Sequence, residues 1–219
     1  DRYANIILPK SASWYSSEDE HYHDVYYLYN TDGSGKRKLF ELAENEKAVN
    51  LKTDATHLYG SIIDGSGMGA AFAVDLQSGE MIRNSNKYDI DGLGKIYSAG
   101  EYVLFATGKA DPYTTAGGSL VIFDKGKGAF REINVTSVNE TEHATITPDG
   151  KRIVTADSYR GSITDEEGGM LRVYDTKSGE LIGSEKITMG SKPICGNEKI
   201  IICDSQRVRE FTYAEMGLN

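Results

Sequence analysis

The feature that most constrains this chain is a turn-punctuated, alternating stretch between His143 and Pro193. Four short apolar runs lie in it, and they read ATIT, RIVTA, MLRVYD and ELIGSEKI. A Pro-Asp-Gly turn follows the first run, and a Thr-Lys-Ser-Gly turn follows the third. Glycine turns between short β-branched runs are typical of antiparallel hairpins. The stretch therefore predicts a meander of four antiparallel strands.

The same pattern recurs along the chain at intervals of 38 to 51 residues, which indicates a repeat protein. The residue that closes the third run of each unit marks the repeat: Asn30, Asp75, Asp124, Asp175 and Tyr213. The units are 1–42, 43–86, 87–136, 137–189 and 190–219, of which the first lacks its first strand and the last lacks its fourth. Units of this kind predict an all-β fold, a β-propeller of four-stranded antiparallel blades, with about 4.5–5 blades over residues 1–219.

Composition agrees with a single propeller domain of many short strands. The chain has 24 Gly, 14 Tyr and only 4 Pro, and it contains no long stretch with a helical hydrophobic period. A formal net charge of −9 repels phosphate backbones, so we expect no nucleic-acid partner. No apolar run reaches the roughly 18 residues of a membrane-spanning helix, so we expect no membrane span.

The run TPDGKRIVTAD, followed by LRVYDTKSGELI and ITMGSKP, resembles the YVTN-type, WD40-like β-propeller repeat. The Gly-His and Trp-Asp signatures of the WD40 repeat itself are missing from these units. The resemblance covers residues 143–193 well and the other units weakly. It implies a toroid of four-stranded blades, usually six to eight. This chain is then either part of a larger ring or an unusually small one.

The loops between second and third strands are long, and blade geometry predicts that they gather at one mouth of the ring. They span 14–23, 64–69, 109–118 and 158–169. Because loops on rigid scaffolds carry function, we expect a protein partner to bind there. The aromatic and histidine residues of these loops are the candidates: Trp14, Tyr15, His21, His23, Tyr113 and Tyr159. The alternative is that these are variable surface loops.

A metal site is a second reading of the first loop. His21 and His23 alternate on one side of an extended segment, and Asp24 follows them. Two imidazoles and a carboxylate suit Zn²⁺ or Cu²⁺, although the spacing fixes no third ligand. Acids in two other loops suit Ca²⁺ or a cationic ligand, or form a solvated rim: Asp111, Asp157, Asp165, Glu166 and Glu167. We expect no other cofactor.

Other signals are weaker. Cys195 and Cys203 lie in adjacent apolar runs, where buried free thiols are expected, although a disulfide across the hairpin is geometrically possible. Asn134 and Asn139 begin glycosylation sequons, which matter only in a secreted eukaryotic protein. The compartment is unknown, with an extracellular or periplasmic one favoured over the cytoplasm. The chain lacks GxSxG and Walker motifs, and its GSGMGA stretch opens no helix.

The sequence thus favours a non-enzymatic propeller that binds a protein or surface partner, in a scaffold role, through its long-loop face. Two alternatives stay open. One is a metal-dependent propeller enzyme of the lactonase or hydrolase kind, which would use His21 or His23 with nearby acids. The other is a propeller subunit of a redox complex, for which the sequence holds no cofactor-attachment motif.

Overall fold

The structure is a computed structural model of the chain. It describes residues 6–8, 14–15, 22–29, 32, 34–64, 68–86, 88–89, 95–106, 116–137, 143–156, 169–188, 192–203 and 208–218. The chain divides into two compact units, Asp1–Lys87 and Tyr88–Asn219. The prediction of a single propeller domain stays a prediction.

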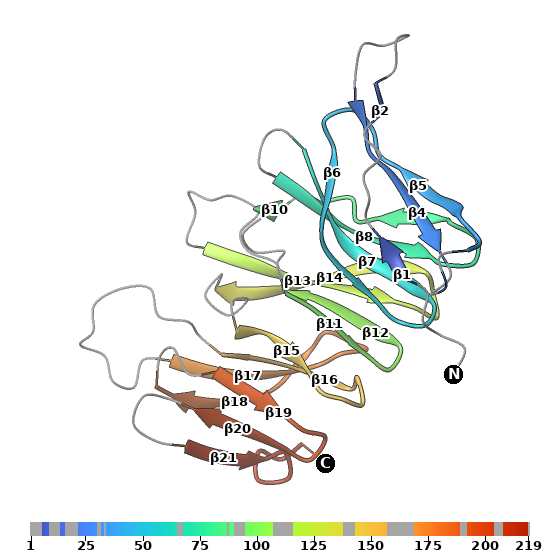
Figure 1. The fold of residues 1–219 in the computed structure, drawn as a ribbon. Coiled ribbons are helices and arrows are strands. Elements are labelled where there is room, and N and C mark those ends of the chain that lie inside the picture. Colours follow the sequence, from blue (N-terminus) through green and yellow to red (C-terminus); the bar gives the residue numbers. More distant parts are fainter. Residues whose placement is uncertain are drawn as a thin grey trace. The chain divides into compact units, whose positions relative to one another are not determined.

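The first unit holds two large antiparallel sheets (Figure 1). The first sheet has the order β1 (Ile6–Leu8), β4 (Val25–Tyr29), β5 (Arg37–Glu41). The second contains β6 (Lys47–Thr53), β7 (His57–Ile63), β8 (Met68–Asp75) and β9 (Met81–Arg83), paired in chain order. A separate small ladder joins β2 (Trp14–Tyr15) to β3 (Tyr22–His23).

The second unit opens with the short strand β10 (Tyr88–Asp89), and three antiparallel meanders follow it. Its first sheet runs β11 (Lys95–Ala99), β12 (Tyr102–Ala106), β13 (Ala116–Asp124), β14 (Ala129–Ser137). The next runs β15 (Thr145–Ile146), β16 (Arg152–Ala156), β17 (Gly169–Asp175), β18 (Leu181–Ile187). The last has three strands, β19 (Lys192–Cys195), β20 (Lys199–Cys203) and β21 (Val208–Thr212).

The fold is therefore all-β, and its four-stranded antiparallel meanders are β-propeller blades, as the sequence predicts. Each sheet arises from a period-2 pattern that sends alternate side chains to opposite faces. In β16, Ile153 packs into the cluster shared with the preceding sheet, whereas Val154 packs into the cluster shared with the following sheet. None of the described residues forms a helix that could cross a membrane.

Four predicted loop boundaries need correction. The segment 14–23 is not all loop, because Trp14 pairs with His23 in the β2–β3 ladder. The other three loops end earlier than predicted, since β8, β13 and β17 begin at Met68, Ala116 and Gly169. The glycine-rich sequence at these strand starts favoured a loop prediction. Glycine nevertheless keeps its backbone donor and acceptor and can pair in a strand, as Gly169 does with Ile187.

The Asp-x-x-Ser-Gly turns have the geometry that their sequence predicts. At the end of β17, the Asp175 carboxylate accepts the Ser178 backbone N–H at 2.6 Å, and Gly179 takes a φ of 79°. Asp75 and Gly79 repeat this arrangement, with a Ser78 N–H bond of 2.6 Å and a φ of 78°. The acid fixes the turn, and glycine supplies the left-handed conformation.

An arginine from the last strand of one sheet lies on the Asp-x-x-Ser-Gly turn of the next. In the first unit, Arg37 donates to the Leu76 carbonyl within the turn that ends at Gly79. In the second unit, Arg131 has an Nη1 atom 3.5 Å from where a Cβ on Gly179 would lie. Arg37 pairs with Leu28, two residues before the repeat position Asn30. Arg131 pairs with Ile122, two residues before Asp124, so the two contacts are equivalent in the repeat.

The equivalent position in the β15–β18 sheet carries glycine instead. Gly183 pairs with Val173, two residues before Asp175. A Cβ on Gly183 would lie 2.9 Å from the Leu218 side chain, so the missing side chain is what lets Leu218 approach. These three positions thus use a cation twice and an apolar contact once, while the second sheet carries Ile82 at the equivalent place, opposite Ala73.

Candidate functional site

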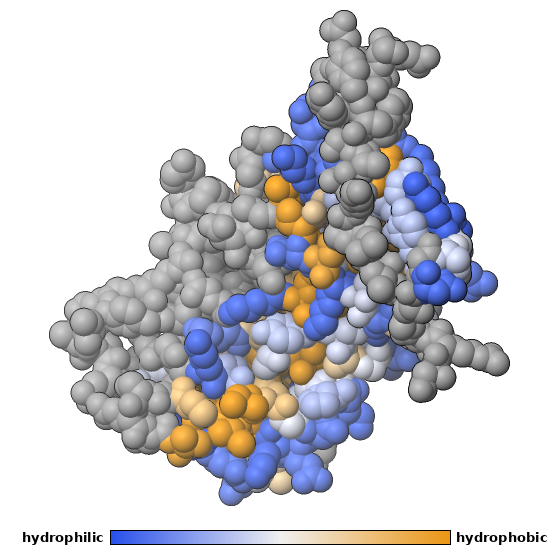
Figure 2. Space-filling model, in the orientation of Figure 1, coloured by the Kyte–Doolittle hydropathy of each residue, from blue (hydrophilic) through white to orange (hydrophobic). Residues whose placement is uncertain are grey.

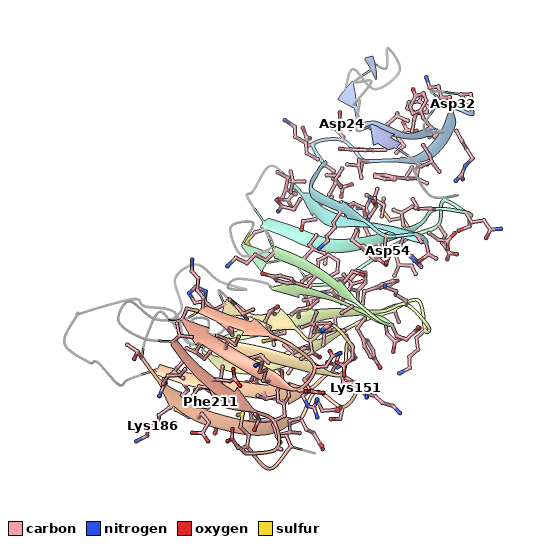
Figure 3. All side chains as sticks on the ribbon, turned by 60° about the horizontal axis from the view of Figure 1, so that its bottom comes forward. Asp24, Asp32, Asp54, Lys151, Lys186 and Phe211 are labelled. Carbon is pink, nitrogen blue, oxygen red and sulfur yellow. The ribbon has the colours of Figure 1, made fainter. Side chains whose placement is uncertain are left out.

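The hairpin ends of the second unit enclose a pocket of about 700 Å³, within the roughly 300–1,000 Å³ usual for ligand sites. Residues near strand ends in three consecutive sheets line it. Gly100 and Glu101 join β11 to β12, and Gly150 joins β15 to β16. Leu218 follows β21. Figure 1 shows the β11–β12 and β15–β16 hairpins side by side, and Figure 3 labels Lys151 at the β15–β16 turn.

The pocket combines an apolar lining with a charged rim. Tyr102, Ile182 and Leu218 are half-buried and supply the apolar surface. The lining also contains the turn acids Asp149 and Asp175. Its other charged residues are Glu101, Lys151, Arg152 and Lys177. An apolar wall with a few charged groups suits a ligand that is partly hydrophobic and partly ionic.

Asp149 is a structural carboxylate of the Pro-Asp-Gly turn. Its Oδ1 accepts the Thr147 hydroxyl at 2.6 Å and the Lys151 N–H at 3.1 Å. Burial alone would raise the pKa of Asp149, but these bonds, with the charges of Lys151 and Arg152, lower it overall. The Asp149 carboxylate therefore stays ionised at neutral pH, and its hydrogen bonds are made within its own turn.

The Asp175 carboxylate likewise accepts a hydrogen bond within its own turn. The Ser178 N–H is the main cause of its lowered pKa, burial opposes the shift, and the Arg131 charge adds to it. Arg131 is itself partly buried, which lowers its pKa, and its Nη2 atom is buried without a hydrogen-bond acceptor. Its guanidinium lies 5.9 Å from the Tyr102 ring centre, beside the pocket.

Arg152 is held in place by the last sheet. Its guanidinium lies 4.4 Å from the Tyr213 ring centre, and its Nη2 donates to the Leu218 carbonyl at 3.4 Å. Tyr213 is buried and donates its hydroxyl to the Gly196 carbonyl at 3.3 Å. Burial raises the pKa of Tyr213, so the ring stays neutral beneath the cation. Arg152 therefore offers a fixed positive charge at the pocket wall.

A direct hydrogen bond joins the turns of two neighbouring sheets at the pocket. The Asn197 side-chain oxygen, from the β19–β20 turn, accepts the Asp149 N–H at 2.9 Å. The Asp149 turn also touches Gly100 of the β11–β12 turn, where a Cβ would lie 3.2 Å from the Asp149 carbonyl oxygen. The first turns of three sheets are thus in contact and make the pocket a preformed feature.

Four of the described titratable groups are poorly suited to acid–base catalysis at neutral pH. Asp75, Asp149 and Asp175 have lowered pKa values, and burial raises the pKa of Cys195 to about 12. A general acid or base at neutral pH needs a pKa near 7. The three carboxyl pKa values are shifted down and the Cys195 pKa is shifted up, so all four move away from 7.

The structure places part of the predicted first-loop site. Trp14 stands opposite His23, and Tyr15 opposite Tyr22, in the β2–β3 ladder. Asp24 follows directly, and its carbonyl accepts the Leu42 N–H at 3.0 Å. The backbone therefore brings Trp14 and His23 together, a pairing that the sequence pattern did not predict.

Several predicted residues lie outside the described part of the chain: His21, Tyr113, Tyr159 and Asn139, with the loop acids Asp111, Asp157, Asp165, Glu166 and Glu167. Asn134 is exposed on β14, where it pairs with Ser119. Within the described ranges, no group of three or more His, Cys, Asp or Glu side chains is placed to hold a metal. The metal prediction on His21, His23 and Asp24 stays a prediction.

Both cysteines are free, as expected. Cys195 pairs with Ile200 and Cys203 with Lys192, so three ladder positions separate them. An odd offset also places their side chains on opposite faces of the sheet, which excludes the alternative disulfide.

The hairpin-face pocket was missed by sequence reasoning, which placed binding at the long loops. Its lining residues come from turns about 50 residues apart. Each turn by itself is an ordinary hairpin connection. The sequence did offer one signal of this pocket, a set of cations next to two of these turns: Lys151, Arg152 and Lys177.

No family model matches the chain, and neither does any curated protein. Several solved structures do. Acylaminoacyl peptidase in complex with Z-Gly-Gly-Phe-chloromethyl ketone matches with a TM-score of 0.54 at 9% identity, over 76% of this chain and 31% of that one.

Oligogalacturonate lyase in complex with manganese matches with a TM-score of 0.50 at 12% identity, over 93% of this chain and 62% of that one. A prolyl endopeptidase matches with a TM-score of 0.50 at 11% identity, over 89% of this chain and 33% of that one. The chain thus spans between about a third and two thirds of these proteins. At such identities the likeness shows the shared fold alone.

Proposed function

We propose that this chain is a non-enzymatic binding module whose hairpin-face pocket holds a segment of a protein partner. The observation that carries the proposal is the pocket itself. It has an apolar wall of Tyr102, Ile182 and Leu218 and a rim that includes Lys151 and Lys177. An extended peptide with one apolar and one acidic side chain fits this combination.

The state of the pocket's charged groups supports binding over catalysis. Asp149 and Asp175 are ionised and already bonded within their turns. Arg152 is fixed on Tyr213. Such groups recognise a ligand by charge and shape, whereas proton transfer needs a group that titrates near neutral pH.

The long-loop residues belong to the same proposal as a second contact area, in which a partner engages Trp14, Tyr15, His21, His23, Tyr113 and Tyr159. Aromatic side chains are common energetic anchors of protein interfaces. The YVTN-type assignment of the repeat and the scaffold role also belong here. The resemblance of residues 143–193 supports them.

A peptide-display selection tests the pocket. Random-sequence peptides are selected on the wild-type chain and then compared on a double variant, Ile182→Glu with Lys177→Glu. We expect enriched peptides to carry an acidic and an apolar residue and to bind the variant at least about 10-fold more weakly. Backbone amide shifts of Glu101, Lys151 and Leu218 should move on titration with such a peptide.

The matched control is Leu181→Glu, a change at the neighbouring exposed residue that lies outside the pocket lining. It should leave peptide binding unchanged. If no enriched peptide distinguishes the double variant from wild type, the pocket is not a peptide site and the proposal fails.

A further inference from the structure

Arg152 is fixed at the pocket wall without a carboxylate partner. Its guanidinium lies 4.4 Å from the Tyr213 ring centre, and its Nη2 donates to the Leu218 carbonyl at 3.4 Å. None of the ion pairs in the described part of the chain includes Arg152. A guanidinium has five N–H donors in one plane, and no nitrogen of Arg152 is both buried and unbonded. Its remaining donors can therefore bind a ligand.

The two turn acids of the pocket already lie beside other cations. The Lys151 ammonium is 3.8 Å from the Asp149 carboxylate, and the charge of Arg131 acts on Asp175. The charge of Arg152 also acts on Asp149, but that carboxylate takes its hydrogen bonds from its own turn. The hydrogen-bonding capacity of Arg152 is therefore left for an anion from outside the chain.

Lys177 is the other cation of the lining that forms no ion pair with the described residues. It is exposed, and an ammonium on a flexible stem loses rotamer freedom when a ligand orders it. Arg152 is half-buried and already ordered on the Tyr213 ring, so less side-chain entropy is lost there. Its planar guanidinium can also bind both oxygens of a carboxylate. Arg152 is thus better suited than Lys177 to select an anionic group.

The wall beside Arg152 is apolar. Leu218 and Ile182 line the pocket with it, and a Cβ on Gly183 would lie 2.9 Å from the Leu218 side chain. Figure 2 shows mostly hydrophilic residues over the hairpin turns at the lower right, in agreement with a charged rim around this wall. Because Arg152 is bonded to Leu218, an anion on its guanidinium would lie close to the apolar wall. The ligand chemistry that fits is a carboxylate with an apolar group next to it.

We propose that Arg152 determines the specificity of the pocket by binding a carboxylate of the peptide ligand. The carboxylate belongs either to an aspartate or glutamate side chain or to a free carboxyl terminus. This role rests on the proposed function, because it names the residue through which the pocket recognises its peptide. A neutral amide in place of the carboxylate loses the charge-assisted bonds that the guanidinium makes.

A double-mutant cycle tests this role. The probe is the tightest-binding synthetic peptide from the selection, compared with its Asn or Gln analogue and with a form amidated at the carboxyl terminus. We expect one of these two changes to weaken binding to the wild-type chain by about 10-fold, and that change identifies the source of the carboxylate. On Arg152→Gln, the carboxylate and amide forms should bind equally. Isothermal titration calorimetry measures each Kd.

Arg152→Lys is a second, more conservative variant, and it keeps the test valid if the glutamine variant does not fold. It retains the charge but loses the planar fork, so the preference for the carboxylate form should fall by about 3-fold. Circular dichroism should show which variants fold.

Arg209→Gln is the matched control. The Arg209 guanidinium lies 5.2 Å from the Phe211 ring centre, and its Nη2 donates to the Lys186 carbonyl at 3.0 Å. Figure 3 labels Phe211 and Lys186, and neither they nor Arg209 belong to the pocket lining. The control therefore removes the same kinds of arginine contact at another place, and it should leave the preference for the carboxylate form unchanged.

An undiminished preference in Arg152→Gln or Arg152→Lys would overturn the role of Arg152. A wild-type chain that binds the carboxylate and amide forms equally would overturn it as well. In both cases the peptides would still distinguish the Ile182→Glu with Lys177→Glu variant from wild type, so the proposed function would stand. If no peptide is enriched at all, the proposed function fails, and the role of Arg152 fails with it.

Discussion

Gly100 and Gly150 meet backbone to backbone between two consecutive sheets. A Cβ on Gly150 would lie 2.6 Å from the Ala99 carbonyl oxygen, and φ is 75° at Gly150 and 54° at Gly100. Both glycines are therefore required by conformation and by the close approach of the turns. The pocket depends on this contact, because both residues line it.

Gly150→Ala should destabilise the chain by about 1–3 kcal/mol, because alanine is strained at a left-handed φ and its methyl group meets the Ala99 carbonyl. Urea unfolding of the second unit measures the loss. Gly196→Ala is the matched control, since its Cβ would make only an ordinary 3.5 Å contact with the Lys199 carbonyl. Equal stability of the two variants would contradict the proposed turn contact.

Asp149→Asn should reduce the acid sensitivity of the fold. The folded pKa of Asp149 lies below its ordinary value of 3.8, so its charge contributes stability above that value, and this contribution is lost as pH falls through the folded pKa. Asparagine keeps an acceptor for Thr147 but does not titrate. Stability measured between pH 6 and about pH 2 should therefore fall less steeply in the variant than in wild type. Parallel curves would contradict the shift.

Arg37→Ala should lower the free energy of unfolding by about 1–2 kcal/mol. The change removes the charged donor to the Leu76 carbonyl and the side chain that packs on the turn at Gly79. Arg83→Ala is the comparison within the same unit. Arg83 makes an exposed ion pair with Glu46 at 2.7 Å, which typically contributes no more than about 1 kcal/mol. Thermal unfolding should rank Arg37→Ala as the more damaging change.

The Cys195 thiol should resist alkylation in the folded chain. Burial raises its pKa to about 12, so little thiolate exists at pH 8. Iodoacetamide labelling followed by peptide mass analysis should find Cys195 unmodified in the native protein and modified after denaturation. Rapid native labelling at Cys195 would show that the last sheet opens readily.

Chelation tests the metal alternative for His21, His23 and Asp24. A binding module without a structural metal should keep its melting temperature in EDTA and carry substoichiometric zinc, copper and calcium by elemental analysis. A stoichiometric metal that His21→Ala and His23→Ala both remove would instead favour the metal-dependent alternative.

The strands were predictable because burial imposes alternation on them. Ile200 and Ile202 face the core and Ile201 faces out, so the pattern in β20 identifies a strand directly. The β2–β3 ladder was not predictable, since Trp14 and His23 pair across a polar segment with no apolar period. The pocket was missed because Gly100, Gly150 and Leu218 become neighbours only when whole sheets stack.

The position shared by Arg37, Arg131 and Gly183 has a consequence for the order of the repeats. Arginine there faces a turn that ends in glycine, whereas Gly183 leaves room for Leu218. Exchanging the β11–β14 segment with the β15–β18 segment would press Arg131 against Leu218, and it would place Gly183 beside the β13–β14 turn in place of Leu218. Each junction is thus specific for the two sheets that form it, so the repeats are not interchangeable modules. Their order along the chain is part of the information that specifies the fold.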